Sequence, residues 1–544
     1  SEMCIRDRYY NILYCLIASI IFNTSCSLER NPLDQFAENE FWTNEENALI
    51  ALTGIYRGNT IFNSEEYSPS DFWSYSGIMF LEFASDNAYD RRGNNSGFFQ
   101  MVNGNLTANN RFTSSYWTNA YAKIARCNRF LDGIGKISAS KEIITRFKSE
   151  ARFIRAVQYF YLSQYFHDVP LVTKVLSKEE ANTVKKNTKE EIVSFIKQEF
   201  QEAAEGLPRW KELKSSEIGR ASKQAALAFL GRTCLAEKQY KEAASAYEEI
   251  IKMGDNSLEA NYNEVFYPAK KGSSEIIIGS QYLTDLAGCG LPQHAYPVKD
   301  QGWCIINPLG SLFEAYQFTD GTDFSYANPL YDKNNLGKNR DPRLDYTIYY
   351  TGATFKGTTY NSHPDSESVD ATQSGQTTQT GFMMRKYFDE NYNGDLKTYG
   401  VNIPIIRYAE VLLSYLEAKM EAGEAITQDL LDETINTVRN RPSVQMPRVT
   451  ETSTGKLRTI LRNERRVELA MEGIRYWDLL RWGIAHEVLQ GKIYGAPFPG
   501  RVKVDGDNNA DPFGRWYVNK WNFRKQDYKW PIPQSEQDIN PNLR

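Results

Sequence analysis

The sequence predicts a mainly α-helical scaffold of tetratricopeptide-like helix pairs that carries two loop-rich, partly β inserts. Three observations lead to this fold class. Apolar residues recur at helical spacing over several long stretches. One pair of adjacent helices has the residue spacing of a tetratricopeptide repeat. Between the helical stretches, two long segments lose this periodicity and gain Gly, Asn, Ser and aromatic residues, which is typical of functional loops.

The composition excludes several classes of protein. The chain has 544 residues, enough for several domains or for one large domain with insertions. Its net charge of −5 argues against a nucleic-acid-binding protein, which would carry a basic surface. Aromatic residues make up 13% of the chain, and those that do not fill a helical core would offer planar faces to ligands. The four histidines are scattered and no HExxH motif occurs, so a metal site of the catalytic zinc type is not expected.

Residues 1–25 are predicted to be a signal peptide. Asn11–Phe22 is an apolar run of signal-peptide length, too short for a stable bilayer span. Small residues and Cys26 follow it, which resembles a lipobox with Asn23 in place of an apolar residue, and predicts lipidation of Cys26. An ordinary secretory signal is the alternative. Glu2 and Asp7 do not fit the positively charged start of a signal peptide, which suggests that the true translation start lies elsewhere.

The N-terminal scaffold is expected at residues 26–255, with an aromatic insert at about 60–110. Its helices are predicted at Asn44–Asn59, Tyr116–Ile134, Lys141–Phe166, Thr188–Glu205 and Ala221–Met253. The last of these ranges contains a helix-turn-helix in which two small residues let the helices approach and larger residues fill the seam. The residues with tetratricopeptide spacing are Leu227, Leu230, Gly231, Ala243, Tyr247 and Ile250.

The second insert, residues 256–402, is expected to form a loop-rich ligand subdomain. Glu275–Gln281 is predicted to be a strand, and Thr347–Tyr360 a pair of strands around Gly352. Asn361–Gly381 is a polar segment rich in Ser, Thr and Gln, and is predicted to be a loop. The insert therefore separates the two helical parts of the scaffold.

The C-terminal part, residues 403–544, is expected to complete the helical scaffold. Helices are predicted at Arg407–Ala422 and Gln428–Asn440. After Val488 the chain becomes loop-rich, and the prolines of Trp530–Leu543 are expected to prevent a regular helix there.

The stretch Leu457–Gly483 combines an apolar helical face with a dense set of charges. Ile460, Val467, Met471 and Ile474 are predicted to share that face, and Gly473 to end or bend the helix. Glu464, Glu468 and Glu472 form a row of carboxylates at i,i+4, which repels itself unless arginines reach across it. The pattern predicts a helix locked into a bundle by Arg–Glu pairs. A solvated charged face is the alternative.

Five stretches in the expected order resemble the SusD/RagB family of cell-surface nutrient-binding lipoproteins. The resemblance implies a tetratricopeptide-like superhelix of several degenerate repeats. It also implies that one face of the scaffold contacts a SusC-like TonB-dependent barrel while the inserts meet the ligand. The stretches are Glu150–Thr173, Ile403–Gly423, Ile435–Pro447, the segment ILRNERRVELAMEGIRYWDLLRWG within Leu457–Gly483, and Trp530–Leu543.

Both inserts carry the side chains that bind sugars, which are aromatic rings for C–H faces and polar groups for hydroxyls. In the resembling family, aromatic residues from these two regions meet the ligand. Each Trp could instead pack locally. The predicted ligand-binding residues are Trp73, Tyr75, Asn87, Tyr89, Arg91, Tyr296 and Trp303, with Asp86, His294 and Gln301 beside them.

No catalytic residues are predicted. The pairs Asp320/Asp323 and Asp341/Asp345 imitate a glycosidase dyad, but both lie in turn-forming sequence where Asp bonds its own backbone. No GxSxG motif, P-loop or dinucleotide-binding motif occurs. No cofactor is expected, although the Asp-rich turns could hold a structural calcium ion. Cys289 and Cys304 flank a loop and could form a disulfide.

The sequence thus predicts a lipid-anchored protein of the outer membrane, facing the cell surface, that captures an oligosaccharide for a SusC-like barrel. A peptide-capturing member of the same family is the nearest alternative. A repeat scaffold that only organises partner proteins is the alternative from another class, and a glycosidase is the most distant.

Overall fold

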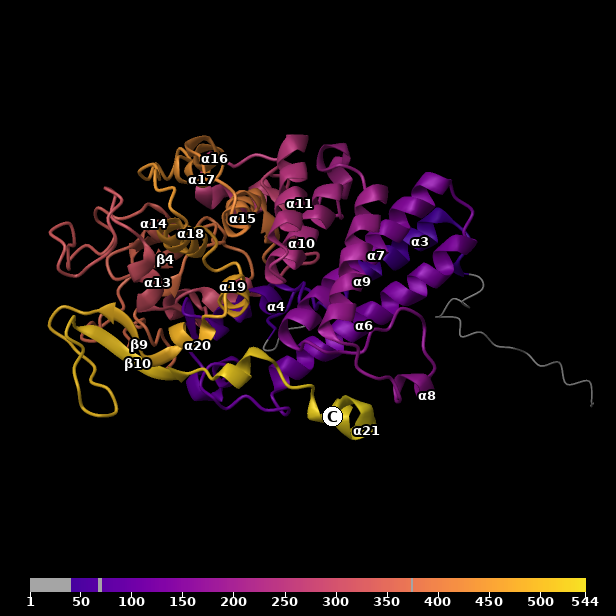
Figure 1. Ribbon diagram of the computed structural model, residues 1–544. Helices are drawn as coiled ribbons and strands as arrows, with labels where there is room; N and C mark the ends of the chain where they lie inside the picture. Colours follow the sequence, from indigo (N-terminus) through magenta and orange to yellow (C-terminus); the bar gives the residue numbers. More distant parts are fainter. Residues whose placement is uncertain (1–40, 67–70, 373–374) are drawn as a thin grey trace, which may run out of the picture.

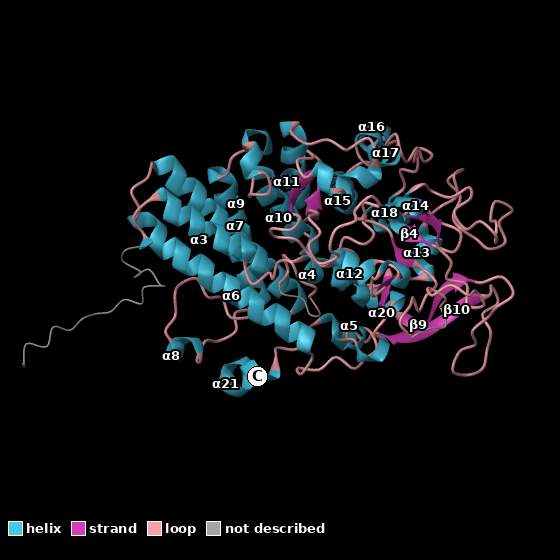
Figure 2. Cartoon of the chain, turned by 180° about the vertical axis from the view of Figure 1, so that it is seen from behind, coloured by secondary structure: helices cyan, strands magenta, loops and turns pink. Residues whose placement is uncertain are grey.

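The computed structural model describes residues 41–66, 71–372 and 375–544. The predicted signal peptide and the lipidation candidate Cys26 lie outside these ranges. Long helices form one end of the molecule, whereas short helices, strands and loops form the other (Figures 1 and 2). Within the described ranges, none of the helices combines the length and apolar character needed to span a membrane.

The N-terminal scaffold consists of long helices at the predicted places. A side-chain cap explains most of their starts: the Thr188 hydroxyl accepts from the Glu191 N–H and the Glu191 carboxylate accepts in return. Asn110 caps a helix that starts five residues before the predicted Tyr116. Leu49 on the first helix is 40% exposed although it is apolar. The helices are α3 (Glu45–Arg57), α6 (Arg111–Gly133), α7 (Lys141–Tyr165), α9 (Lys189–Gly206), α10 (Lys223–Ala236) and α11 (Tyr240–Met253).

Helices α10 and α11 form the predicted tetratricopeptide pair. All six residues that carry the spacing are buried. A Cβ added to Gly231 would lie 2.5 Å from the Tyr247 ring, so only glycine lets the two helices approach this closely. The helical, tetratricopeptide-like fold class is confirmed.

The inserts contribute short strands that pair in twos. Strand β1 (Ala88–Asp90) pairs with β3 (Ile306–Pro308), β2 (Ile276–Ser280) with β8 (Ile403–Arg407), β4 (Ile348–Tyr349) with β7 (Met383–Met384), and β5 (Thr354–Phe355) with β6 (Thr358–Thr359), all antiparallel. The pair of strands predicted around Gly352 is wrong, because the turn does not lie at Gly352. The hairpin reverses at Lys356 and Gly357, which both have positive φ, and β4 pairs elsewhere.

Short helices fill the space between these strands. They are α4 (Tyr75–Met79), α5 (Gly97–Gln100), α12 (Leu291–Ala295), α13 (Gly310–Ala315) and α14 (Arg343–Thr347), with α8 (Lys178–Ala181) on a loop of the scaffold.

The C-terminal part departs from the prediction at four places. The helix predicted at 428–440 is broken at Thr434, whose φ and ψ are −119° and −97°. Helix α18 ends at Glu468, because Met471 and Gly473 adopt positive φ, so Met471 and Ile474 do not share the face of Ile460. A long hairpin replaces the predicted loops after Val488. A short helix forms between the prolines of the last segment. The elements are α15 (Tyr408–Glu421), α16 (Gln428–Glu433), α17 (Ile435–Arg439), α18 (Thr454–Glu468), α19 (Arg475–Arg481), α20 (Ala485–Val488), β9 (Gln490–Pro497), β10 (Arg515–Asn522) and α21 (Gln534–Ile539).

The carboxylate row of α18 is buried and paired, as predicted. Glu468 Oε1 lies 2.7 Å from Arg407 Nη1 and 3.1 Å from Arg441 Nη2, and Arg343 reaches both Glu464 and Glu468. Burial acts to raise the pKa of the Glu468 carboxyl, but the three guanidiniums outweigh it and hold the pKa far below its usual value. We call this set the charged cluster: Glu275, Arg343, Lys386, Arg407, Arg441, Glu464, Glu468 and Glu472.

Candidate functional site

The two inserts meet in the β1–β3 ladder. Tyr89 lies opposite Asn307, Asp90 lies opposite Ile306, and the Arg91 N–H donates to the Ile305 carbonyl at 3.0 Å. Residues more than 200 positions apart thus form one surface, and the aromatic and polar residues predicted in each insert lie close to this junction.

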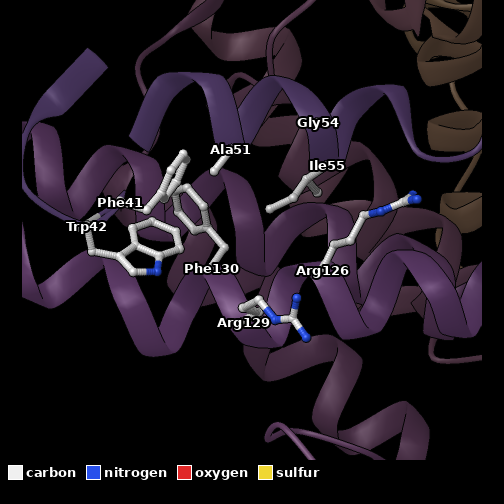
Figure 3. Close-up of a pocket in the computed structure, with 8 residues that line it drawn as sticks. All are labelled: Phe41, Trp42, Ala51, Gly54, Ile55, Arg126, Arg129 and Phe130. Carbon is white, nitrogen blue, oxygen red and sulfur yellow. The ribbon is translucent and has the colours of Figure 1, made fainter. Parts of the chain in front are cut away.

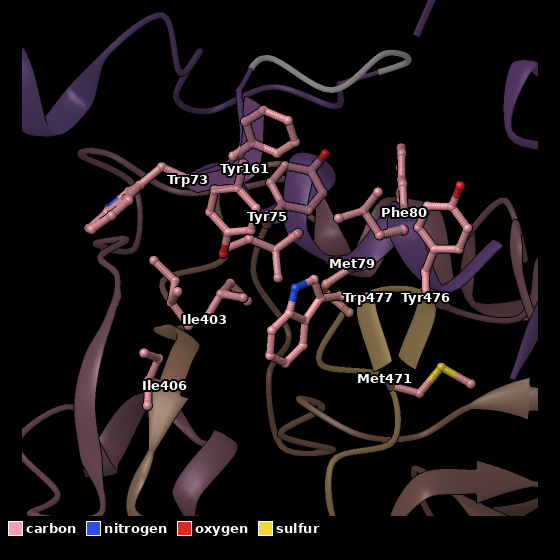
Figure 4. Close-up of a cluster of buried hydrophobic side chains, with 14 of the residues drawn as sticks. Trp73, Tyr75, Met79, Phe80, Tyr161, Ile403, Ile406, Met471, Tyr476 and Trp477 are labelled. Carbon is pink, nitrogen blue, oxygen red and sulfur yellow. The ribbon is translucent and has the colours of Figure 1, made fainter. Parts of the chain in front are cut away.

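Five of the seven predicted ligand-binding residues lie in the core instead. Trp73 and Tyr89 are 5% and 6% exposed, and Tyr75, Asn87 and Tyr296 are fully buried. Figure 4 shows Trp73 and Tyr75 among side chains from the segments 403–406 and 471–477. The Trp73 ring lies edge-on to Phe153 and below the Lys123 ammonium group, with no face open to a sugar. For these residues, burial favours the packing role over the stacking role.

Asp86 and Asn87 connect the first insert to the C-terminal part of the scaffold. Asp86 forms ion pairs with Arg475 at 2.7 Å and Arg466 at 3.0 Å, and Arg466 Nε donates to Asn87 Oδ1 at 2.9 Å. Burial acts to raise the pKa of Asp86, but the two arginines outweigh it and lower the pKa to about 2. Asp86 and Asn87 therefore fix the insert rather than face a ligand.

The remaining predicted residues lie closer to the surface. Arg91 and Trp303 are half-buried, and Gln301 is exposed. The Trp303 ring packs at 5.4 Å from His294, whose pKa burial lowers to about 3, so the imidazole is neutral at pH 7. Of the buried Tyr89, the hydroxyl is the group that reaches this region, where it accepts from Asn519 Nδ2 at 2.9 Å.

Asn519 belongs to the β9–β10 hairpin, which the sequence analysis missed. Its amide donates both to Tyr89 and to Asn94 Oδ1, at 3.1 Å. The neighbouring Tyr517 is half-buried and packs edge-on to Tyr494 at 6.2 Å. The run Trp516-Tyr517-Val518, bounded by Gly514, was the available strand signal.

Together these contacts define a polar and aromatic surface that we call the platform: Tyr89, Arg91, Asn94, Gln376, Tyr517 and Asn519. Arg91 Nη1 donates to Gln376 Oε1 at 2.7 Å and to the Gly375 carbonyl at 3.3 Å. Amide and guanidinium groups can bond sugar hydroxyls, and tyrosine rings can pack on sugar C–H faces. The platform combines both chemistries.

The acidic pairs considered for catalysis are engaged in local structure. Asp320 accepts from the Thr322 N–H and hydroxyl. Asp341 forms an ion pair with Arg343 at 2.7 Å, and Asp345 accepts from the Tyr350 hydroxyl. The described residues contain no group of three or more His, Cys, Asp or Glu side chains that could hold a metal ion, and the calcium ion stays a prediction.

Cys289 and Cys304, which the sequence left open as a possible disulfide, are not bonded, and both thiols are free. Cys289 lies in a bridge to Tyr399, whereas Cys304 lies beside Asn307 at the start of β3. Burial raises the pKa of each thiol to about 12, so both are protonated and unreactive at neutral pH.

A pocket of about 350 Å³ lies on the scaffold, far from the platform in the fold. Phe41, Trp42 and Phe130 line one end, and Arg126 and Arg129 line the other (Figure 3). Arg129 also borders an apolar groove of about 380 Å³ between α6, α8 and α21. Residues of α6 line both hollows, and no residue of the platform lines either of them.

The chain is similar to known families and to solved structures. Residues 247–544 match the model of the SusD family, and residues 59–235 match a model described as starch-binding, associating with outer membrane. The crystal structure of a SusD-like carbohydrate binding protein from Bacteroides fragilis is 54% identical, with a TM-score of 0.89 over 93% of this chain and 100% of that one.

Two more distant proteins are similar over nearly their whole length. SusD-like protein P25 of Formosa agariphila is 24% identical, with 98% of this chain and 97% of that protein covered. Surface glycan-binding protein A of Bacteroides thetaiotaomicron, solved in complex with laminarihexaose, is 19% identical with a TM-score of 0.68 over 92% and 99% of the two chains. The latter shows a shared fold.

Proposed function

The chain belongs to the SusD family, and from this premise we propose that it captures a nutrient glycan at the surface of the outer membrane. The observation that carries the proposal is the β1–β3 ladder, which joins the two aromatic-bearing inserts to each other. The 54% identical relative is named a carbohydrate binding protein, which supports the same class of ligand.

The geometry of the surface supports binding rather than catalysis. The platform offers amides, a guanidinium and tyrosine rings, which suit an uncharged or charged polyol. Hydrolysis of a glycosidic bond needs two carboxyl groups held at a set separation and free to act. The acidic pairs weighed for that role serve turns and ion pairs instead.

The finer parts of the proposal rest on family membership. We expect a SusC-like TonB-dependent barrel to receive the glycan, and an acylated Cys26 to hold the protein at the membrane. In this arrangement the barrel supplies the energy for import, and this chain supplies affinity and gating. Co-purification with a barrel from the native membrane, and mass spectrometry of the lipid-linked N-terminus, test these two parts separately.

The binding function is tested by a screen of the purified protein against a panel of polysaccharides, using affinity gel electrophoresis. Retardation by one class of glycan is the expected result and would identify the substrate.

Trp303→Ala should then weaken that affinity about 2- to 12-fold, because a stacked ring contributes about 0.5–1.5 kcal/mol. Trp482→Ala is the matched control, since Trp482 is another half-buried Trp but packs on arginines of α19 and α18.

Each other result has a definite meaning. Equal affinity of Trp303→Ala and Trp482→Ala would remove Trp303 from the site while leaving the glycan ligand. Binding of peptides without any glycan would favour the peptide-capturing alternative. Binding of neither would leave a scaffold that only organises partner proteins.

A further inference from the structure

Arg91 differs from the buried arginines of the scaffold. In the charged cluster, Arg343, Arg407 and Arg441 each lie within 2.5–2.8 Å of a Glu carboxylate. Arg465 and Arg475 likewise pair with Asp478 and Asp86. In the described part of the chain, by contrast, no carboxylate lies within ion-pair distance of Arg91. The two short internal gaps, 67–70 and 373–374, contain no acidic residue.

The partners that Arg91 does have are neutral. Its Nη1 donates to the Gln376 amide oxygen and the Gly375 carbonyl. Its Nε is buried without a partner, and no acceptor for Nη2 occurs among the described residues. Burial lowers the pKa of the Arg91 guanidinium below its usual value. The cost of taking this charge out of water is therefore not offset by an ion pair among the described residues.

The two nearest anionic candidates are not available to Arg91. Asp90 is held by Arg92 at 2.7 Å and accepts from the Ser96 hydroxyl at 2.5 Å. Cys304, which lies close by, is a neutral thiol because burial raises its pKa to about 12. The described residues therefore leave the Arg91 guanidinium free to pair with an anion of a ligand.

A second buried arginine without a carboxylate, Arg340, has aromatic rings in place of an anion, while its Nε and Nη1 have no hydrogen-bond partner in the part of the chain that the structure describes. Arg340 is enclosed by the rings of Phe313, Phe318 and Phe324, with its guanidinium carbon 4.1–5.4 Å from their centroids. It also donates to the carbonyls of Phe313 and Tyr316. Aromatic faces stabilise its charge. No ring lies over Arg91 in the described residues, and its guanidinium is half-buried at the surface rather than enclosed.

The position of Arg91 connects this unpaired charge to the proposed glycan surface. Arg91 directly follows β1 and is two residues from Tyr89 along the chain. The Tyr89 hydroxyl and Asn94 are both bonded to Asn519, so the guanidinium and these amides flank the end of the same short strand. A ligand long enough to cover this strand end would meet both.

We propose that the platform selects acidic glycans, with Arg91 pairing to a carboxylate or sulfate group on the sugar. A guanidinium is suited to such planar or tetrahedral oxyanions, because its donors are fixed in a fork. The inference rests on the proposed glycan-binding function and specifies its substrate class. Gln376 fixes the guanidinium, and the amides of Asn94 and Asn519 bond the neighbouring hydroxyls.

The test uses matched charged and uncharged ligands with the purified full chain. Isothermal titration calorimetry compares oligogalacturonate with its carboxyl-reduced form, and carrageenan oligosaccharides with their desulfated form. These two pairs distinguish a uronate carboxylate from a sulfate ester. Starch and laminarin oligosaccharides serve as neutral glycans. We expect one acidic ligand to bind at least 10-fold more tightly than its uncharged counterpart, and the difference to shrink as salt is raised.

Variants assign the effect to Arg91. Arg91→Gln should weaken the acidic ligand about 10- to 100-fold, the usual range for a lost charged hydrogen-bond pair, and leave its uncharged counterpart nearly unchanged. Arg91→Lys keeps the charge without the fork and should retain part of the affinity. Arg501→Gln is the control, because Arg501 is an exposed arginine near the far end of the hairpin, paired with Asp365 at 3.4 Å, and should bind like the wild type.

Three results would overturn the inference. Binding of neutral glycans only would reject it while leaving the glycan-binding function intact. Equal affinity of Arg91→Gln and wild type for the acidic ligand would place the selectivity elsewhere. Binding of no glycan of either kind would reject the inference together with the proposed function. Thermal unfolding of each variant shows whether the variant is folded, so that a loss of affinity can be assigned to the binding surface.

Discussion

The charged cluster and the platform both contain arginine, but the arginines have different kinds of partner in the two regions. In the charged cluster, arginines from α14, β8 and the segment after α17 converge on the carboxylates of α18, and every guanidinium has an anionic partner. On the platform, a single arginine has only neutral partners and lies half-buried at the surface. The charges of the cluster therefore hold the fold together, whereas the charge of the platform is available to a ligand.

The two regions also differ in how far they tolerate change. Removing one member of a buried network leaves the others uncompensated, so the fold depends on the complete set. A half-buried side chain without a strong internal partner contributes little to the stability of the fold. The residue at that position can therefore differ between proteins that bind different ligands. The predictions below test this difference, beginning with the largest expected effect.

Arg407→Met should have the largest effect on stability. The substitution removes a buried guanidinium that contacts Glu275, Glu468 and Glu472 together, which is expected to lower the free energy of unfolding by about 3–5 kcal/mol. Urea denaturation followed by circular dichroism measures the change. Arg448→Met removes a solvent-exposed ion pair with Asp432, which water and salt screen, and should change the stability little. Equal losses in the two variants would mean that the cluster is not a stabilising network.

Trp73→Ala should destabilise the protein by a comparable amount, about 3–5 kcal/mol, because the ring is packed in the core. Its glycan affinity, measured at a temperature where the variant is folded, should equal that of the wild type. A variant that keeps its melting temperature but loses glycan affinity would instead make Trp73 a contact residue, as the composition of the first insert suggested.

Acid should weaken the link between the first insert and the scaffold. The folded pKa of Asp86 is lowered to about 2, so its ion pairs stabilise the protein above the unfolded pKa of about 4 and are lost as the pH falls towards 2. The expected loss is about 2 kcal/mol over this window. Denaturant unfolding between pH 2 and pH 6 should show a shallower pH dependence for Asp86→Asn than for the wild type. Identical slopes would contradict the assignment.

Arg91→Gln should have the smallest effect on stability, within about 0.5 kcal/mol of the wild type. Its charge has no anionic partner to lose, and its two hydrogen bonds go to neutral oxygens in exposed residues. The same denaturation experiment measures the change. A loss close to that of Arg407→Met would show that Arg91 belongs to the structural network and would remove the contrast between the two regions.

The scaffold was largely predictable because its signals are local. Helical periodicity located α3, α7 and α9 to within about two residues, and side-chain caps at Asn44 and Thr188 account for their starts. The small Gly231 opposite the large Tyr247 identified the repeat pair from spacing alone. The carboxylate row of α18 required arginines, although the sequence did not show that they come from β8 and α14.

The site was less predictable because it depends on contacts between distant segments. Composition located both inserts, but it could not separate the buried Trp73 from the half-buried Trp303, since each lies in a similar polar and aromatic stretch. The hairpin was missed because a long connection separates β9 from β10 and bulges interrupt their alternation. The end of α18 was missed because Met471 adopts a positive φ that is uncommon for a non-glycine residue.

The hydrogen bond between Tyr89 and Asn519 also bears on the order of events during synthesis of the chain. The two residues are 430 positions apart, and Asp86 and Arg475 are 389 apart. A ribosome has to finish all but the last 25 residues before the Tyr89–Asn519 contact can form, whereas α10 and α11 can pair soon after they emerge. The long helices are therefore available early to support later segments. The platform is complete only when the chain is almost complete, so a truncated product is expected to retain much of the scaffold but to lack a complete platform.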